Sequence, residues 1–248
     1  MEMSAWLEPV RRAGPAILAA ALVLAACVRA ADSPAPSIAT TPEATPVTDD
    51  WIGLFDGTSA DAWRGYGQDS LPTSWAVEDG ELHALPGPGT DLITRDTFAD
   101  FELQFEWRVS AAGNSGVMYR VVESEAPAWA SGPEYQVLDD AGHPDGRDPK
   151  TAAGSLYGLI APNETKRAEP VGTFNTGRIV VSDGHVEHWL NGSLVVAYDW
   201  DSADVRSLIG ASKFRELPGF MSADAGGIVL QHHGEEVWFR NIRIRRLG

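Results

Sequence analysis

The 248-residue sequence has little cysteine and little positive charge, and both shortages limit what the protein can be. Cys27 is the single cysteine, so no intrachain disulfide can form. Lysine and arginine total 19 against 35 aspartate and glutamate residues, which gives a net charge of −16. No basic cluster stands out, and phosphate binding needs concentrated positive charge. The composition therefore argues against a nucleic-acid partner, and the acidity is interpreted as a source of solubility.

The sequence also lacks the short motifs of several common enzyme classes. It contains no GxGxxG or P-loop, no CxxC or HExxH metal motif, and no GxSxG nucleophile elbow. Any chemistry must therefore come from residues that the fold brings together.

Near the amino terminus an apolar run, residues 16–26, follows Arg11 and Arg12 and ends at Cys27. The run is too short for a transmembrane helix but fits the hydrophobic part of a signal peptide. The residues LAAC (24–27) resemble a bacterial lipobox, which implies cleavage before Cys27 and lipid attachment to it. The alternative is an ordinary secretory signal in which Cys27 is incidental.

This interpretation divides the chain into three parts. Residues 1–26 are predicted to be a lipoprotein signal peptide, and the Pro- and Thr-rich residues 27–50 a flexible tether. Residues 51–248 are predicted to form one β-sandwich domain. The expected location is the bacterial cell envelope, lipid-anchored in the outer membrane or periplasm or at the cell surface.

The globular part shows many short strand patterns and one helix. Asp-Gly and Asn-Gly pairs at residues 79–80, 183–184 and 191–192 indicate tight antiparallel hairpins. Residues 202–214 form the one helix pattern, with Ser202 as the cap and Gly210 near its end. The remaining strands are expected at residues 51–55, 92–94, 101–109, 113–122, 133–138, 228–233 and 237–244. The prediction is an all-β sandwich or jelly roll of antiparallel strands.

Residues 101–109 alternate most cleanly, with Phe101, Leu103 and Phe105 on one side. Glu102 and Glu106 share the other side. They could form the carboxylate pair of a glycosidase, but a solvated face is the favoured interpretation.

The stretch from Asn114 to Asp139 is the other informative pattern. Glu134 and Gln136 are two residues apart in a strand and are expected on one side, with Tyr135 and Met118 facing the core. Such a row could form a polar ligand site, or it could be an ordinary solvated face. The following loop holds Asp139, Asp140, Asp145 and Asp148, which could bind Ca²⁺ but fit ordinary loop chemistry better.

Nine segments together resemble one bacterial family, the 3-keto-disaccharide hydrolase domain, also called the domain of unknown function 1080. In the family's order they are LFDG (54–57), WAVEDGEL (75–82), DFELQFEWR (100–108), GNSGVMYR (113–120), EYQVLDD (134–140), SLYGLIAP (155–162), HWLNG (188–192), GGIVLQHHG (226–234) and FRNIRI (239–244). One departure is GTFN (172–175), where Phe174 stands in place of the family's usual tryptophan.

The resemblance implies a concanavalin-like β-sandwich and cleavage of glycosides whose C3 hydroxyl is oxidised to a ketone. The implied partners are such a 3-keto sugar and an upstream glycoside 3-dehydrogenase. A non-catalytic carbohydrate-binding lipoprotein is the alternative function, because fold transfers between relatives better than reaction does.

A C3 ketone makes the C2 proton acidic, so a base could form an enolate and expel the C1 substituent by β-elimination, with or without later addition of water. Glu134 or His233 is the candidate base, and Tyr157 or His233 the acid. Arg120 or Lys213 is the candidate group at the enolate oxygen. Sugar hydroxyls are expected to bind Asn114, Gln136, Asp139, Asn175 and Gln231.

No cofactor is certain from the sequence. A divalent metal at the ketone is an open alternative, with Glu134, Asp139 and His233 as its ligands.

The lipoprotein hypothesis is testable in cells. Metabolic labelling with a fatty acid should tag the protein, and Cys27→Ser should abolish the label because it removes the thiol that carries the lipid. A label that persists in the Cys27→Ser protein would rule the anchor out.

Overall fold

The structure is a computed structural model that describes residues 50–124 and 126–248. The predicted signal peptide, Cys27 and all but the last residue of the predicted tether lie outside the described residues. Within the described part, no helix is both long and apolar enough to cross a membrane.

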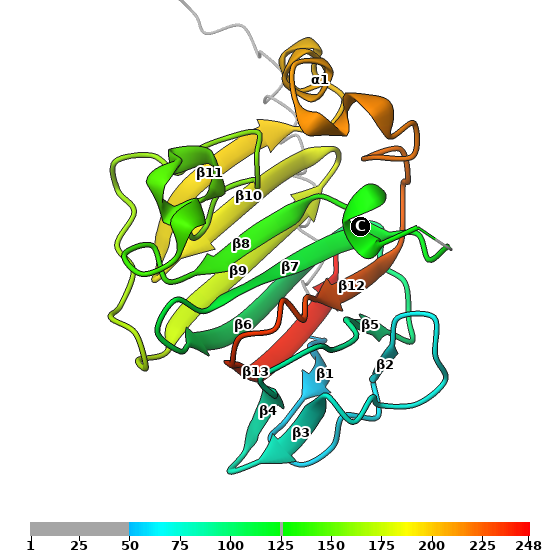
Figure 1. Cartoon of the computed structure of the whole chain (residues 1–248). Coiled ribbons are helices and arrows are strands. Elements are labelled where there is room, and N and C mark those ends of the chain that lie inside the picture. Colours follow the sequence, from blue (N-terminus) through cyan, green and yellow to red (C-terminus); the bar gives the residue numbers. More distant parts are fainter. Residues whose placement is uncertain (1–49, 125) are drawn as a thin grey trace, which may run out of the picture. The chain divides into compact units, whose positions relative to one another are not determined.

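Thirteen strands form two antiparallel sheets that face each other (Figure 1). The larger sheet has the order β11 (Ser193–Asp199), β10 (His185–Leu190), β9 (Asn175–Ser182), β6 (Phe101–Val109), β13 (Val237–Arg246), β4 (Glu81–Ala84) and β3 (Trp75–Glu78), with β1 (Ile52–Phe55) paired to β13. The smaller sheet has the order β2 (Trp63–Gly65), β5 (Leu92–Thr94), β12 (Gly227–Leu230), β7 (Asn114–Val121) and β8 (Glu134–Leu138). This architecture confirms the predicted all-β sandwich.

The helical pieces are short. The described residues hold one α-helix, α1 (Ala203–Gly210), which Ser202 caps by accepting a hydrogen bond from the Val205 amide. It ends at Gly210, short of the predicted Phe214, because Ser212 caps a separate turn there. The 3-10 turns are η1 (Ala128–Ala130), η2 (Pro144–Arg147), η3 (Pro149–Thr151) and η4 (Lys213–Glu216).

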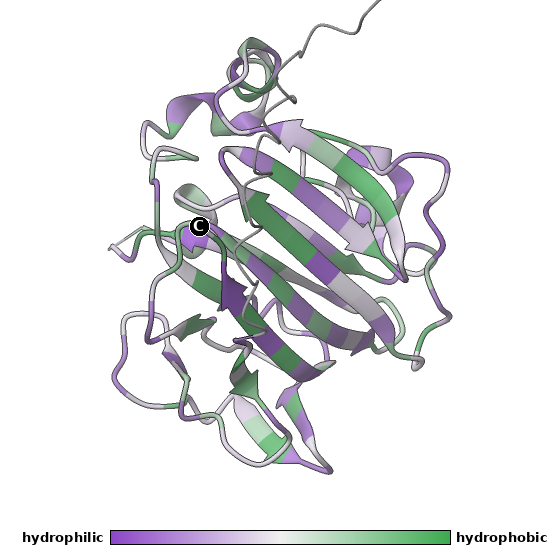
Figure 2. Cartoon of the chain, turned by 180° about the vertical axis from the view of Figure 1, so that it is seen from behind, coloured by the Kyte–Doolittle hydropathy of each residue, from purple (hydrophilic) through white to green (hydrophobic). Residues whose placement is uncertain are grey.

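Alternation along β6 places apolar side chains between the sheets and charged ones outside. Phe101, Leu103 and Phe105 are buried in the main core, and Figure 2 shows the larger sheet banded alternately hydrophobic and hydrophilic. On the outer face, Glu102 accepts hydrogen bonds from Arg178 and Arg245, and Glu106 accepts one from Arg240. Both carboxylates are paired with arginines, but Glu102 is 4% exposed, so the solvated-face interpretation fits Glu106 and not Glu102.

The three predicted hairpins are present. Asp79 and Gly80 have φ angles of 52° and 78°, and the pairs at 183–184 and 191–192 repeat this left-handed geometry. Positive φ at both central residues matches the right-handed twist of the strands on either side.

Strand β7 departs from the expected alternation at Arg120. Arg120 has φ = 50°, and the register with β12 shifts at this point. As a result Met118 and Val121, three residues apart, pack in the same small cluster on the outer face of the smaller sheet. The expectation that Met118 faces the main core is therefore wrong, and the side chain of Arg120 is turned away from its neighbours on the strand.

Candidate active site

A cavity of about 190 Å³ opens on the outer face of the smaller sheet. We call it the small-sheet cavity. It is lined by Asn114, Trp129, Glu134, Asp145, Tyr157, Lys213, Phe214, Gln231 and His233.

A larger hollow of about 730 Å³ lies against the larger sheet, but its charged groups already have partners. Arg178 pairs with Glu102 and stacks on Trp189, and Arg243 donates two hydrogen bonds to Gln104. A side chain that is to react with a ligand must not be fully engaged by other side chains, so the small-sheet cavity is the better candidate.

Glu134 forms the floor of the small-sheet cavity, and Gly116 makes room for it. The two residues come from the paired strands β8 and β7, in which Glu134 lies opposite Met118 and Gly116 opposite Gln136. A Cβ atom on Gly116 would lie 2.0 Å from Oε1 of Glu134. The glycine of GNSGVMYR is therefore needed because the carboxyl group folds over its backbone.

The carboxyl group of Glu134 is desolvated without a compensating partner. Glu134 is 8% exposed, and none of the described residues donates a hydrogen bond to its carboxyl group. Burial raises its pKa to about 8, while the Lys213 ammonium opposes this rise and Asp91 and Asp145 add to it. At pH 7 Glu134 is therefore mainly a neutral acid, which is able to donate a proton.

One wall of the cavity places the Lys213 ammonium beside aromatic rings. Nζ of Lys213, on η4, lies 4.4 Å from the centroid of the Tyr157 ring and 5.8 Å from that of Trp129. Tyr157 donates a long hydrogen bond of 3.4 Å to Asp145. Burial, then the negative charges of Asp145 and Glu134, raise the pKa of Tyr157 to about 12, so its hydroxyl remains a hydrogen-bond donor.

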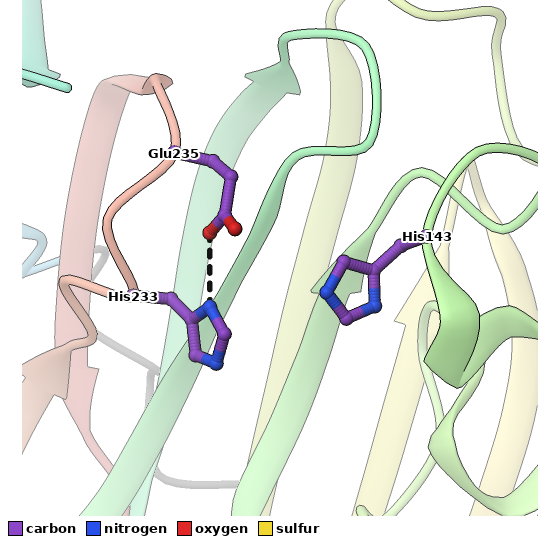
Figure 3. Close-up of side chains that lie close together, drawn as sticks. All are labelled: His143, His233 and Glu235. Atoms are coloured by element: carbon purple, nitrogen blue, oxygen red, sulfur yellow. Dashed lines mark hydrogen bonds and ion pairs between the residues drawn. The ribbon is translucent and has the colours of Figure 1, made fainter. Parts of the chain in front are cut away.

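His233 faces the cavity from the loop between β12 and β13. Its Nδ1 lies 2.9 Å from Oε2 of Glu235, and the ring of His143 stands edge-on at 5.9 Å (Figure 3). A carboxylate only accepts hydrogen bonds, so Nδ1 carries the proton and Nε2 keeps a lone pair in the neutral ring. His233 can therefore accept a proton at Nε2.

The ligand atoms of His143, His233 and Glu235 lie within 4.8 Å of one another, which raises the question of a metal. The hydrogen bonds do not fit one. Nδ1 of His143 accepts from the Asp145 amide, so its Nε2 carries the proton and has no lone pair for a cation. No cofactor is established for these residues.

Asn114 and Gln231 complete the floor. Nε2 of His143 is 3.5 Å from the amide of Asn114, whose Oδ1 is buried without a partner. The protonated Nε2 favours the amide orientation in which Oδ1 faces His143. Gln231 donates its backbone N–H to Gly116, which fixes the end of β12 beside Glu134.

Four of the ten predicted site residues lie elsewhere, which corrects their expected placement. Arg120 pairs with Asp100 at 3.0 Å and stacks on Trp200, so it contacts neither Glu134 nor the cavity. Gln136 is covered by the loop after η3 and donates to the Thr151 carbonyl.

The side chains of Asp139 and Asn175 accept hydrogen bonds from backbone amides and do not face the cavity. Asp139 accepts hydrogen bonds from the amides of Ala112, Ala141 and Gly142. Asn175, on the larger sheet, accepts from the Glu169 amide and from Asn191. The proposed metal set of Glu134, Asp139 and His233 is therefore not assembled.

Sequence reasoning missed several groups that surround the cavity. Trp129, His143, Phe214 and Glu235 come from loops and turns without strand periodicity, and Asp145 was considered only as a Ca²⁺ ligand. The one available sequence signal was Trp129, an aromatic residue between small residues. In the structure Trp129 is 40% exposed.

The two sheets define a β-sandwich protein, and the small-sheet cavity is a candidate acid–base site on one sheet face. The 3-keto-alpha-glucoside-1,2-lyase-like domain family matches residues 50–245. The chain belongs to this family, which confirms the resemblance noted in the sequence.

Relatives agree with this assignment. A Bacteroides thetaiotaomicron protein named 3-keto-disaccharide hydrolase is 38% identical over an alignment of 230 residues, which covers 80% of this chain and 79% of that protein. A crystal structure from Parabacteroides distasonis, provisionally named a glycosyl hydrolase, superposes with a TM-score of 0.75 at 30% identity, covering 80% of this chain and 94% of that one. A second such structure from the same organism gives a TM-score of 0.63 at 27% identity, covering 80% and 100%.

The buried carboxyl group predicts a pH-dependent stability difference. The pKa of Glu134 is higher in the folded protein, about 8, than its ordinary value of 4.5, so the folded state binds this proton more tightly. The stabilisation of the folded state by this bound proton is complete below pH 4.5 and is lost as the pH rises through about 8. Glu134→Gln should therefore match the wild type near pH 4 and exceed its unfolding free energy above pH 8 by on the order of 5 kcal/mol.

Urea unfolding of both proteins across this pH range measures the effect. A stability difference that stays constant from pH 4 to pH 9 would show that Glu134 is not desolvated.

Proposed function

We propose that the protein cleaves the glycosidic bond of 3-keto-glycosides, with net hydrolysis of 3-keto-disaccharides, in the small-sheet cavity. Family membership and the name of the Bacteroides relative support the substrate class. The observation that carries the proposal is the buried carboxyl group of Glu134, whose pKa burial raises to about 8, in the same cavity as Lys213 and as His233, whose Nδ1 is held by Glu235.

The reaction begins with removal of the proton at C2, next to the ketone. Nε2 of His233 takes this proton, and the electron pair of the C–H bond moves into an enolate whose oxygen is the former ketone oxygen. Lys213 stabilises that negative charge, because an ammonium in a partly dry cavity interacts strongly with a developing oxyanion. The rings packed around Lys213 hold it on this side of the cavity.

The C1–O bond then breaks as the enolate electrons return. Glu134 gives its proton to the leaving glycosidic oxygen, so the first sugar or aglycone departs neutral. Addition of water reverses the proton movements: water oxygen bonds to C1, its proton returns to Glu134, and His233 returns a proton to C2. Atoms and charges balance, and both residues regain their starting forms.

This assignment differs from the sequence interpretation, in which Glu134 was a candidate base. A carboxyl group with a pKa of about 8 is a poor base at neutral pH because most of it is protonated. A histidine with a free Nε2 takes that role, and two groups with opposite protonation states divide the acid and base work.

The size of the cavity sets how a disaccharide would lie. A volume of about 190 Å³ is below the range of roughly 300–1,000 Å³ typical of ligand pockets, so the cavity would enclose the oxidised ring and leave the second ring at the rim. Trp129 is exposed at that rim and offers an aromatic face on which a sugar can stack.

We also propose that the protein is held at the bacterial cell envelope by a lipid on Cys27. A glycoside 3-dehydrogenase would supply the ketone that the reaction requires, because an ordinary glycoside lacks the acidic C2 proton.

Incubation of the pure protein with a 3-keto-glucoside or 3-keto-trehalose should release the aglycone or sugar. Glu134→Gln should lower kcat by about 100-fold or more, the usual contribution of a general acid. The matched control is Glu106→Gln on the larger sheet, which should keep wild-type turnover. Binding of unmodified glycans without turnover of any keto-sugar would instead identify a carbohydrate-binding module.

The pH profile separates the two roles of Glu134. If it is the acid, kcat/KM falls as the pH rises through about 8, because the proton to be donated is lost. A kcat/KM that rises through this range would mean that Glu134 is the base, and would overturn the assignment.

Gly116→Ala should disrupt the same group without removing it. The new Cβ would lie 2.0 Å from Oε1 of Glu134, so the carboxyl group must move by more than an ångström. A displacement of this size costs about 100-fold in kcat/KM. Gly53→Ala is the matched control, since a Cβ there meets nothing within 4 Å. Equal activities of the two variants would show that the position of Glu134 does not matter.

A further inference from the structure

Glu235 was not among the residues that the sequence pointed to, yet its contact with His233 is closer than any other side-chain contact of that histidine. Oε2 of Glu235 lies 2.9 Å from Nδ1 of His233. In Figure 3 the second ring nitrogen of His233 points away from the carboxylate. The two side chains are 34% and 44% exposed, so solvent can compete for this contact and the backbone must hold it in place.

The loop geometry explains how residues only two positions apart meet. Gly234, between them, has φ = 116°, a conformation that a residue with a Cβ rarely adopts. In an extended strand the side chains on either side of it would stand roughly 7 Å apart along the chain. The turn at Gly234 brings the carboxylate back onto the imidazole.

Backbone hydrogen bonds fix this loop along its whole length. The Gln231 amide donates to the Gly116 carbonyl, and the Gly234 carbonyl accepts from the Gly87 amide. At the far end the Glu236 carbonyl accepts from the Ser110 amide. The His232 amide donates to Asp91. The loop is thus tied by four hydrogen bonds to three segments, namely β7, the β4–β5 loop and the turn after β6, and the His233–Glu235 contact is part of a built arrangement.

We infer that Glu235 is a positioning residue that holds His233 in the tautomer with its lone pair on Nε2, facing the small-sheet cavity. Without the carboxylate, a neutral histidine in water places its proton mostly on Nε2, which would turn the base into a donor. The hydrogen bond to Glu235 reverses this preference and also fixes the ring plane. Glu235 itself touches no reacting atom.

His143 limits how the ring can respond. Its imidazole stands nearly perpendicular to that of His233, at an angle of 84° and a centroid distance of 5.9 Å. Nδ1 of His143 is already committed to the Asp145 amide, so it cannot take over the role of Glu235. The carboxylate is therefore the group that selects the tautomer of His233.

This inference rests on the proposed function for the role of His233, but one readout is independent of it. The ring ¹⁵N chemical shifts of His233 in the substrate-free protein report the tautomer directly, with His233→Gln used to assign the signals. The wild type should show a protonated Nδ1. In Glu235→Leu, which removes the acceptor opposite Nδ1, the Nε2-protonated form should become the major species.

Kinetics give the second readout. Glu235→Leu should lower kcat on a 3-keto-glucoside by about 100-fold with little change in KM, because substrate contacts remain while the base is lost. Glu235→Asp keeps the acceptor and should recover part of kcat. The matched control Glu236→Leu changes the neighbouring residue, which contacts His83 outside the cavity, and should behave as the wild type.

Each failure has its own signature. If the wild type turns over no keto-sugar, the proposed function fails and the ¹⁵N shifts alone decide the role of Glu235. Unchanged tautomer and unchanged kcat in Glu235→Leu overturn the inference. So does a wild-type activity that a chelator removes and Zn²⁺ restores, since His233 and Glu235 would then be binding a cation.

Discussion

The structure depends on one desolvated carboxyl group, that of Glu134. Ionising it inside the sheet face is unfavourable, and no hydrogen bond from the described residues offsets this cost. The carboxyl group stays buried because the strand geometry of β7 and β8 directs it over Gly116, which gives it space. The opposite face of β8 is closed by the core around Tyr135 and Val137. The rest of the cavity is arranged around a neutral acid.

A polar network between the sheets positions one wall of the cavity. Tyr119 of the smaller sheet lies 2.7 Å from both Nε2 of His188 and the hydroxyl of Tyr198 on the larger sheet. Nδ1 of His188 donates to the carbonyl of Gly154. Burial lowers the pKa of His188 to about 4, so the ring stays neutral and keeps one donor and one acceptor. The loop that carries Tyr157 is thereby anchored to the core.

The parts of the fold with regular periodicity were predictable from sequence. The alternation of residues 101–109 and the Asp-Gly and Asn-Gly turns depend only on neighbours in the chain, and all are present. Glu134 and Gln136 do share a strand face, yet only Glu134 reaches the cavity, because a distant loop covers Gln136. Strand alternation does not predict which polar residue is covered, because that depends on the tertiary structure.

Arg120 shows the same limit within a strand. Its positive φ changes the alternation of β7, so the cation points to Asp100 and Trp200. Arginine gives no sequence signal for such a bulge, whereas glycine or asparagine would have. Lys213 supplies the charge instead, from a turn that is held by the packing of Phe214 on Phe220 and by the Ser212 cap.

The contrast between the two sheets explains why we propose the smaller one as the reactive face. On the larger sheet, Glu102 is held by Arg178 and Arg245, and these contacts lower its pKa despite partial burial. A carboxylate saturated by arginines is a weak base and has no proton to give. On the smaller sheet, burial without arginines produces the opposite state in Glu134. The proposed reaction needs a proton donor at neutral pH, and a buried carboxyl group without an arginine partner meets this need. Lys213 would stabilise an oxyanion, but its effect on the pKa of Glu134 is smaller than that of burial, so it does not ionise the acid.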